Sequence, residues 1–265
     1  MSAQLSYAYA VVRSSATAAP AALSGIRGVA GAPVTLVRAG PVAAAVSPVP
    51  ADEFSETALK ARLEDLDWLE ATARAHHVVV DALAAHTTVL PLRLATVYRD
   101  DARVERMLNA REQDFTSLLD RLDGHLEWGV KVYAEADPAP PPGQDAPAGE
   151  PGSGRAYLRR RRQQYRTRED VWRAAEEAAR RTAELARGLA MDRARHRPQQ
   201  GDLAAVPGRH VANVANDAYL VPRHLAEEFR ERMRHAADDL PGVRVEVTGP
   251  WAPYSFTAQP EGARR

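Results

Sequence analysis

Residues 247–256 read VTGPWAPYSF, which places a strand end, two prolines and three aromatic side chains in a span too short for a helix. Valines alternate with charged residues from Val243 to Val247, so the pattern predicts a half-buried strand. Because proline lacks a backbone amide hydrogen, we expect this strand to stop at Gly249-Pro250. It is the last element of the second half of the chain, and its place in the order of elements decides the fold of that half.

The aromatic segment, residues 250–256, has two interpretations. In the first, Trp251, Tyr254 and Phe256 cover the end of a domain core, since three exposed aromatic side chains would leave much apolar surface in water. In the second, they bind a partner whose strand pairs with a free sheet edge. We take these three aromatics, together with Arg93 in the middle of a strand-like stretch, as candidate partner contacts. The packing role is the alternative.

The second half of the chain, residues 125–265, is predicted to contain six elements in the order strand, helix, strand, strand, helix, strand. The first strand is LEWGVKVY, the next two form a hairpin whose second arm is VANVANDAYLV, and the fourth is the closing strand. The first helix covers residues 157–192, and the second begins at Pro222. This order is the split β-α-β arrangement of ferredoxin-like domains. Residues 137–154 are dominated by proline, glycine, alanine and acidic residues, so they predict a mobile loop within that domain.

The first half, residues 1–124, predicts a separate α+β domain. The alternating LSYAYAV from Leu5 predicts an opening strand, and residues 34–49 predict a hairpin that turns at Gly40-Pro41. Strands followed by helix, strand and helix are typical of α+β domains. The chain is therefore predicted to be a two-domain α+β protein with domains 1–124 and 125–265.

The helices of the first half are predicted from apolar spacing and capping residues. Residues 55–86 predict one helix capped by Ser55, with Leu59, Leu63 and Leu66 on its apolar face. LPLRLATVY, which starts at Leu90, predicts a strand. A second helix follows Asp100 and ends at Asp123-Gly124.

Composition argues against several classes of function. The 35 basic residues balance the 35 acidic ones, so the chain has no overall field that would hold it on nucleic acid or on an anionic membrane. Cysteine is absent, which excludes disulfides, thiolate metal sites and cysteine nucleophiles. We see neither a signal peptide nor an apolar run of the roughly 20 residues that a membrane-spanning helix needs. We therefore expect a soluble, cytoplasmic protein.

His76, His77 and His86, with Asp81, are the best candidates for a metal site or a general base. On a helix His77 and Asp81 are i, i+4 neighbours, but His76 and His77 point about 100° apart and cannot share one face. The ligand set is incomplete, so solvated or capping histidines are the favoured interpretation. Neither a nucleophile elbow nor a P-loop occurs in the sequence. We predict no catalysis, no metal and no cofactor, and a His-dependent enzyme is an alternative.

An arginine run, residues 159–162, raises a nucleic-acid hypothesis. Residues 155–197 contain fourteen arginines and six acidic residues. Several of these arginines lie one helical turn from Glu169, Glu176, Glu177 or Glu184, and no aromatic platform or zinc framework accompanies them. A solvated arginine-rich face is the favoured interpretation, an acidic protein partner is the next, and nucleic-acid binding is the alternative from another functional class.

Four motifs occur in a characteristic order: LPLRLATVY at Leu90, EWGVKVY at Glu127, NDAYLV at Asn216 and VTGPWAPYSF at Val247. A GI-x-G loop at Gly25 and the helical His76 precede them. In this combination the chain resembles the gas vesicle protein family that unites GvpF and GvpL, over nearly its whole length. Two departures are visible, because Ala95 stands where this family commonly has glycine and His77 where an acidic residue often follows the histidine.

The resemblance implies an accessory protein of gas vesicle assembly, with an α+β N-terminal domain and a modified ferredoxin-like C-terminal domain. Members are similar in contacting the small hydrophobic shell protein and other accessory proteins during vesicle nucleation, without an established catalytic step. We therefore expect a cytoplasmic, gas vesicle-associated protein with those partners, and without nucleic-acid or membrane partners. We expect it to shield apolar surface of the shell protein until that protein joins the shell.

Overall fold

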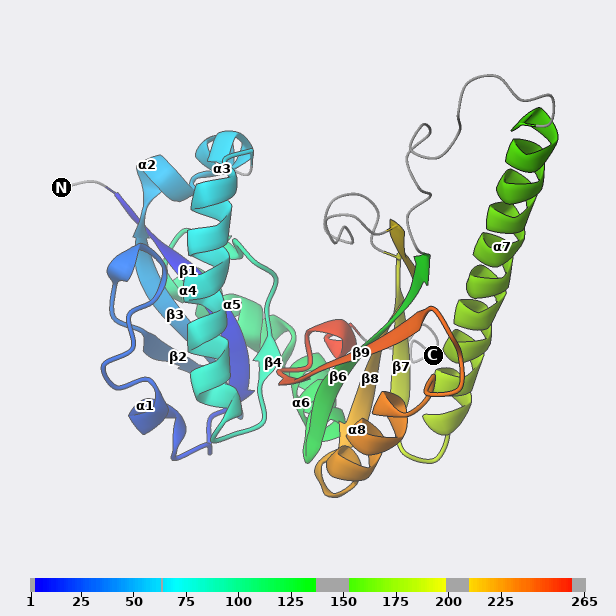
Figure 1. Cartoon of the computed structure of the whole chain (residues 1–265). Coiled ribbons are helices and arrows are strands. Elements are labelled where there is room, and N and C mark those ends of the chain that lie inside the picture. The colour runs from blue at the N-terminus through cyan, green and yellow to red at the C-terminus, as the bar shows by residue number, and fades with distance from the viewer. Residues whose placement is uncertain (1–2, 63, 137–152, 199–209, 259–265) are drawn as a thin grey trace. The chain divides into compact units, whose positions relative to one another are not determined.

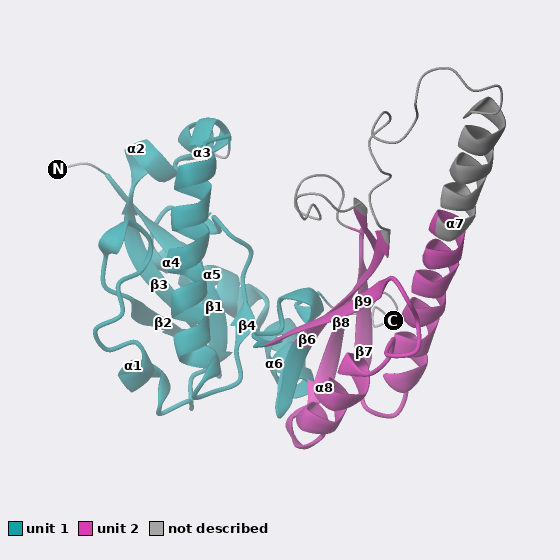
Figure 2. Ribbon diagram, viewed as in Figure 1, with its two compact units in different colours: residues 1–127, 250–265 teal, residues 128–249 magenta. Residues whose placement is uncertain are grey.

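A computed structural model describes residues 3–62, 64–136, 153–198 and 210–258 of the 265-residue chain (Figure 1). Its contacts divide the chain into two compact units, Met1–Glu127 with Pro250–Arg265, and Trp128–Gly249 (Figure 2). The chain has mixed helix and sheet content, with two antiparallel sheets. The predicted domain limits, 1–124 and 125–265, stay a prediction. In the contact division the aromatic segment groups with the first unit.

The first unit contains a five-stranded sheet in the order β2–β3–β1–β4, with β5 also paired to β1. Its strands are β1 (Gln4–Arg13), β2 (Thr35–Ala39), β3 (Val42–Pro50), β4 (Leu90–Pro91) and β5 (Val97–Tyr98). The β2–β3 hairpin turns at Gly40 and Pro41, where Ala39 pairs with Val42, and Gly40 adopts a positive φ of 55°. The predicted opening strand and hairpin are both confirmed.

Helices pack on this sheet, and Figure 1 shows α4 in front of it and α5 behind it. The helical elements of the unit are α1 (Ala19–Ala22), η1 (Val29–Gly31), α2 (Ala51–Phe54), α3 (Glu56–Arg62), α4 (Leu66–Ala84), α5 (Asp101–Ala110), α6 (Glu112–Leu122) and η4 (Tyr254–Phe256). The Asp100 carboxylate accepts a hydrogen bond of 2.8 Å from the Arg103 amide and caps α5. This start and the end at Asp123-Gly124 confirm the prediction, although Arg111 separates α5 from α6.

β1 lies in the middle of the sheet and is buried from residue 6 to residue 12. Its register against β3 shifts between Ala8 and Ala10, as at a β-bulge. A bulge reverses the alternation of side chains, so Ala10 and Val12 join Tyr7 and Tyr9 in one hydrophobic cluster. Simple alternation in LSYAYAV would have placed Val11 in that cluster instead.

The predicted single helix over residues 55–86 is wrong, because the chain forms α3 and α4 separately. The Ser55 hydroxyl accepts from the Ala58 amide at 3.4 Å, which supports a cap there, while the Asp65 carboxylate caps α4 through the Trp68 amide at 3.1 Å. Leu66 is 76% exposed, so the predicted apolar face does not include it. The restart at Asp65 rotates α4 so that it buries a different set: Thr72, His76, Val79, Val80 and Leu83.

The predicted strand LPLRLATVY is also wrong as a continuous element. Only β4 and β5 pair with β1, and between them the Arg93 carbonyl accepts from the amide and the hydroxyl of Thr96, at 3.2 and 2.6 Å. Ala95 has a φ of 60°, in the left-handed region that favours glycine. A residue in that conformation cannot continue a strand, so the stretch folds as a turn.

The second unit is built on a four-stranded sheet in the order β7–β8–β6–β9. Its elements are β6 (His125–Ala136), α7 (Ser153–Leu185), β7 (Asp192–His196), β8 (His210–Pro222), η3 (Arg223–Leu225), α8 (Ala226–Arg234) and β9 (Val243–Trp251). The predicted order of six elements is confirmed. A core cluster of Val132, Ala134, Ala175, Ala178 and Ala237 joins β6 to α7 and to the turn after α8.

Two predicted boundaries in the second half differ from the structure. The long helix ends at Leu185 rather than at Asp192, where β7 already begins. β9 continues through Pro250 to Trp251 rather than stopping at Gly249-Pro250. Since β9 is an edge strand, a proline there does not remove a central ladder bond. Of the predicted mobile loop, residues 137–152 lie outside the described residues.

Candidate interaction site

The aromatic segment lies against helix α4 within the first unit. The Trp251 ring is 5.6 Å from the ring of His77, and the Tyr254 ring is 6.1 Å from it, measured between centroids. Tyr254 also lies 6.4 Å from His76. Two of the predicted contact residues therefore meet the histidine pair of α4, an encounter that the sequence did not indicate.

Burial separates the three aromatic side chains of the segment. Phe256 is 4% exposed and Tyr254 is partly buried against the core cluster, whereas Trp251 is 41% exposed. Ala252, between Trp251 and Tyr254, is itself a buried member of that cluster. Most of the segment is therefore packed, and Trp251 is the ring that it presents to solvent.

A buried carboxylate anchors the segment. Glu127 is 7% exposed, and its two oxygens accept hydrogen bonds from Ser255, one from the amide at 2.8 Å and one from the hydroxyl at 2.7 Å. Hydrogen bonds to a charged acceptor are stronger than neutral ones, so this pair fixes the segment next to the start of β6. Sequence reasoning missed it, because Glu127 occupies an ordinary polar position in the alternating strand LEWGVKVY.

Tyr7 of β1 connects the sheet to α4 and to the turn at Ala95. Its hydroxyl accepts from the Ala95 amide at 3.0 Å and lies 3.0 Å from His76 Nδ1. Burial, then the nearby His77, lowers the pKa of His76 to about 4, against a smaller opposite effect of the Leu92 carbonyl.

The histidines do not assemble a metal site. His76 points into the core, while His77 Nε2 lies 2.9 Å from a carboxylate oxygen of Asp81 on the partly exposed side of α4. His86 is exposed beyond the end of α4. Within the part of the chain that the structure describes, no three His, Asp or Glu side chains come together to hold a metal ion.

Arg93, the fourth candidate contact, is exposed in the turn between β4 and β5. Its backbone carbonyl closes that turn, and among the described residues its side chain has no ion pair or ring contact. The structure does not bring Arg93 into contact with the three aromatic residues. It presents a solvated guanidinium on the same unit as Trp251.

The arginine-rich helix is neutralised in part by its own acidic residues. Arg173, Arg180 and Arg187 pair with the acidic residue three positions earlier, and Arg181 pairs with Asp239. These partners are three residues apart, whereas the sequence indicated pairs four residues apart. Either spacing places the two side chains one helical turn from each other. The side chains of the 159–162 run lie outside the described residues, so the nucleic-acid alternative stays untested.

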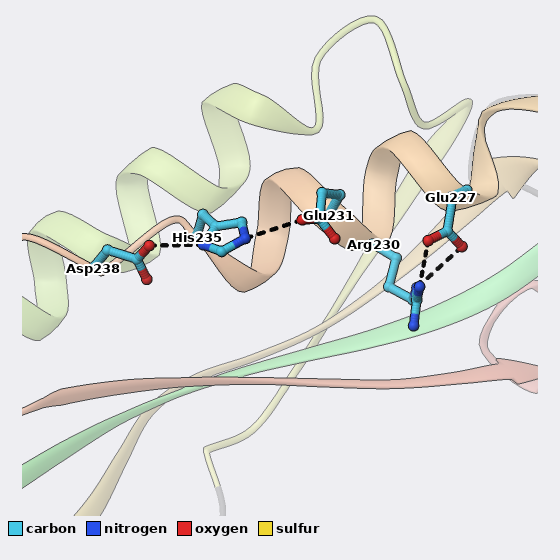
Figure 3. A network of polar contacts seen from close by, with 5 residues as sticks. All are labelled: Glu227, Arg230, Glu231, His235 and Asp238. Carbon is cyan, nitrogen blue, oxygen red and sulfur yellow. Dashed lines mark hydrogen bonds and ion pairs between the residues drawn. The ribbon is translucent and has the colours of Figure 1, made fainter.

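A second group of charged residues lies along α8 and the turn that follows it (Figure 3). Arg230 pairs with Glu227, and His235 lies 3.1 Å from Glu231 and 2.7 Å from Asp238. Hydrogen bonds to the carboxylates of Asp238 and Glu231 raise the pKa of His235, the opposite direction from His76. The paired side chains are three or four residues apart, and all but the half-buried Arg230 are exposed, which is typical of a solvated helix face.

No helix among the described residues is long and apolar enough to cross a membrane. The model of the family "Gas vesicle synthesis protein GvpL/GvpF" matches residues 5–258 of this chain. Gas vesicle protein L of Streptomyces sp. (strain CB03234) is 48% identical over 255 residues, which cover 96% of this chain and 92% of that protein. Gas vesicle protein F of the same strain is 32% identical over 126 residues, 48% of this chain and 47% of that protein.

Two solved structures have the same fold. The crystal structure of GvpF from Anabaena sp. PCC7120 superposes with a TM-score of 0.64 at 15% identity and covers 97% of both chains. That of GvpF from Microcystis aeruginosa gives 0.62 at 16% identity, covering 96% of this chain and 99% of the other. The family model, the relative of near-equal length and the two solved structures all name gas vesicle proteins. The chain belongs to the gas vesicle protein GvpL/GvpF family.

Proposed function

We propose that this chain is a non-catalytic accessory protein of gas vesicle assembly, which binds the small hydrophobic shell protein and other accessory proteins while vesicles nucleate in the cytoplasm. The observation that carries the proposal is the family match over residues 5–258, with 48% identity to a gas vesicle protein L of similar length. The family is one of gas vesicle proteins, which supports a role in the vesicle and not in metabolism.

We also infer that the second unit is a modified ferredoxin-like domain. The support is the order β6, α7, β7, β8, α8, β9 together with the sheet order β7–β8–β6–β9, in which the first and third strands lie at the centre. The helices of this order pack against a sheet whose outer strands are β7 and β9. Such a scaffold offers exposed helix and strand surfaces to protein partners and provides no cofactor site by itself.

For the contact with the shell protein, burial favours Trp251 over the other two aromatics. Its ring is 41% exposed and rests on His77, so it is held in place without being covered. Aromatic side chains held in this way are frequent anchors of protein interfaces, because little conformational entropy is lost on binding. We propose Trp251 and the exposed Arg93 as partner contacts, with Tyr254 and Phe256 positioning the segment.

The test is an affinity measurement between the purified chain and the gas vesicle shell protein. We expect Trp251→Ala to weaken binding at least tenfold, which is the size of effect that removal of an interface anchor produces. The matched control is Trp172→Ala, since Trp172 of α7 is similarly exposed at 44%. Both variants must keep a cooperative thermal transition. Equal binding by the two variants would remove Trp251 from the interface, and no binding by the wild type would overturn the proposed shell-protein partner.

A further inference from the structure

β2 is an edge strand. Among the described residues its one strand partner in the sheet order β2–β3–β1–β4 is β3, and no strand pairs with its outer side. Ala39 and Val42 flank the two-residue turn, so they form a hydrogen-bonded pair, as do Val37 with Ala44 and Thr35 with Val46. In an antiparallel ladder the intervening residues point their amides and carbonyls the other way. Leu36 and Arg38 therefore direct theirs to the open edge.

A groove with a volume of about 750 Å³ lies beside this edge. We call it the β2 groove; its walls come from α1, from the loop at residues 24–27 and from β2 itself. Of the residues of β2, Thr35, Leu36 and Arg38 line it, whereas Val37 and Ala39 do not. Two of the lining residues, Leu36 and Arg38, are also the ones whose backbone groups point to the edge of the sheet.

The chemistry of the β2 groove is apolar in the middle and positive on its walls. Pro20, Leu23, Ile26 and Leu36 provide the apolar surface, and the charged lining residues are Arg27 and Arg38. Both arginines are exposed, and within the described part of the chain neither is paired with a carboxylate. Arg27 reaches the carbonyl of Gly31 at 3.5 Å. No acidic residue lines the groove to neutralise them.

These three properties together specify the kind of ligand. Unpaired backbone groups on an edge strand bind another extended strand, because only such a strand matches their spacing. The apolar surface suits alternate side chains of that strand, and two unpaired guanidinium groups suit carboxylates, which they bind bidentately. A nucleic acid would satisfy the arginines but not the strand edge.

We propose that the β2 groove binds an extended segment of a second gas vesicle protein, which adds as a strand beside β2 and carries apolar residues with flanking acidic ones. That the segment comes from a gas vesicle protein rests on the proposed function. β2 has five residues, so the added strand is short, and the acidic side chains distinguish it from other extended segments. This contact uses a different surface from the one around Trp251.

The first experiment measures the affinity of the full chain for the gas vesicle shell protein and, in separate arms, for each accessory protein of the same gas vesicle gene cluster. We expect Arg27→Glu with Arg38→Glu to weaken one of these complexes at least tenfold and Arg27→Gln with Arg38→Gln to weaken it less. Arg106→Glu, an exposed arginine of α5, is the matched control and leaves that complex unchanged.

The second measurement distinguishes strand addition from simple charge attraction. Saturation with the partner identified above is expected to slow hydrogen exchange of the Leu36 and Arg38 amides at least tenfold. The Val37 amide, which already bonds to β3, is the internal reference and changes little. Equal exchange at Leu36 and Arg38 with and without the partner would overturn strand addition.

The remaining outcomes are also decisive. If a partner binds the wild type and the charge-reversed variant equally, the β2 groove is not its site, while the proposed function stands. If no gas vesicle protein binds the wild type, both proposals are overturned. If concentration-dependent self-association is lost on charge reversal while every heterologous complex is kept, the groove binds a second copy of this chain, and the assignment to another gas vesicle protein is wrong.

Discussion

The aromatic segment and the β2 groove are opposite kinds of surface on the same unit. The segment has three aromatic side chains and a recognisable motif, yet Phe256 is buried, Tyr254 is packed, and Ser255 is tied to a buried carboxylate. The β2 groove includes part of the GI-x-G loop at Gly25 and no aromatic side chain. Within the described residues its backbone edge pairs with no further strand, and its arginines have no carboxylate partner. A conspicuous aromatic motif can therefore mark packing, while a surface without aromatic side chains offers free binding groups.

The largest expected effect comes from a change in the packed surface, the aromatic segment. Phe256→Ala removes a ring that is 4% exposed, so we expect the free energy of unfolding to fall by about 3–5 kcal/mol. Chemical denaturation measures it, with Phe256→Leu as the control that keeps most of the volume and costs less than about 1.5 kcal/mol. A loss below 1 kcal/mol for Phe256→Ala would mean that the segment is not part of the core.

The next effect is a dependence of stability on pH that originates at His76. Its pKa is about 4 in the folded chain and near 6.5 when unfolded, so between these values the unfolded chain binds more protons. The free energy of unfolding therefore rises with pH across this window. The contribution from His76, up to about 3 kcal/mol, is fully present above pH 6.5 and is lost as the pH falls toward 4.

Denaturation at a series of pH values checks this prediction. We expect His76→Gln to flatten the dependence between pH 4 and 6.5, whereas His77→Gln, on the partly exposed side of the same helix, retains most of it. A flat profile for the wild type, or the same slope in the His76 variant, would show that another group is responsible.

A smaller loss is expected when the anchor of the aromatic segment is weakened. Glu127→Gln replaces a charged acceptor by a neutral one, so we expect the free energy of unfolding to fall by about 1.5–3 kcal/mol. The fluorescence of Trp251 reports the accompanying release of the segment. Ser255→Ala is the milder control, because the amide bond to Glu127 remains. If Glu127→Gln were as stable as the wild type, the anchor would contribute nothing.

Ala95→Gly is expected to change stability in the opposite direction. Ala95 holds a φ of 60°, which costs a residue with a Cβ atom about 1–2 kcal/mol, while glycine gives back about 0.4–1 kcal/mol through the greater freedom of the unfolded chain. The net expectation is a gain of roughly 0.5–1 kcal/mol, seen as a higher melting temperature. A decrease would mean that the turn tolerates alanine without strain.

The smallest expected effect on stability comes from changes in the β2 groove. Arg27→Glu with Arg38→Glu alters two exposed side chains without carboxylate partners, so we expect stability to change by no more than about 0.5 kcal/mol. Thermal denaturation at matched salt checks this. A large loss would show that the β2 groove is a structural element and would place it in the same class as the aromatic segment.

Much of the fold was predictable from local patterns. The hairpin at Gly40-Pro41, the cap at Asp100 and the six-element order of the second half are written in turn residues and in hydrophobic period, which act over a few residues. The family was likewise visible in four ordered motifs. Of the four candidate contact residues, Trp251 and Arg93 are exposed, and their role in binding a partner stays a prediction.

Other features of the molecule depend on contacts between segments that are distant in the sequence. Which of two adjacent histidines is buried depends on the rotation of α4, which the cap at Asp65 sets. The turn in LPLRLATVY depends on the Tyr7 hydroxyl, and the position of the aromatic segment depends on Glu127, more than a hundred residues earlier in the chain. Local sequence determined which elements form, because capping and periodicity are short-range. The tertiary structure decided which side chains are covered, because burial is a property of the assembled unit.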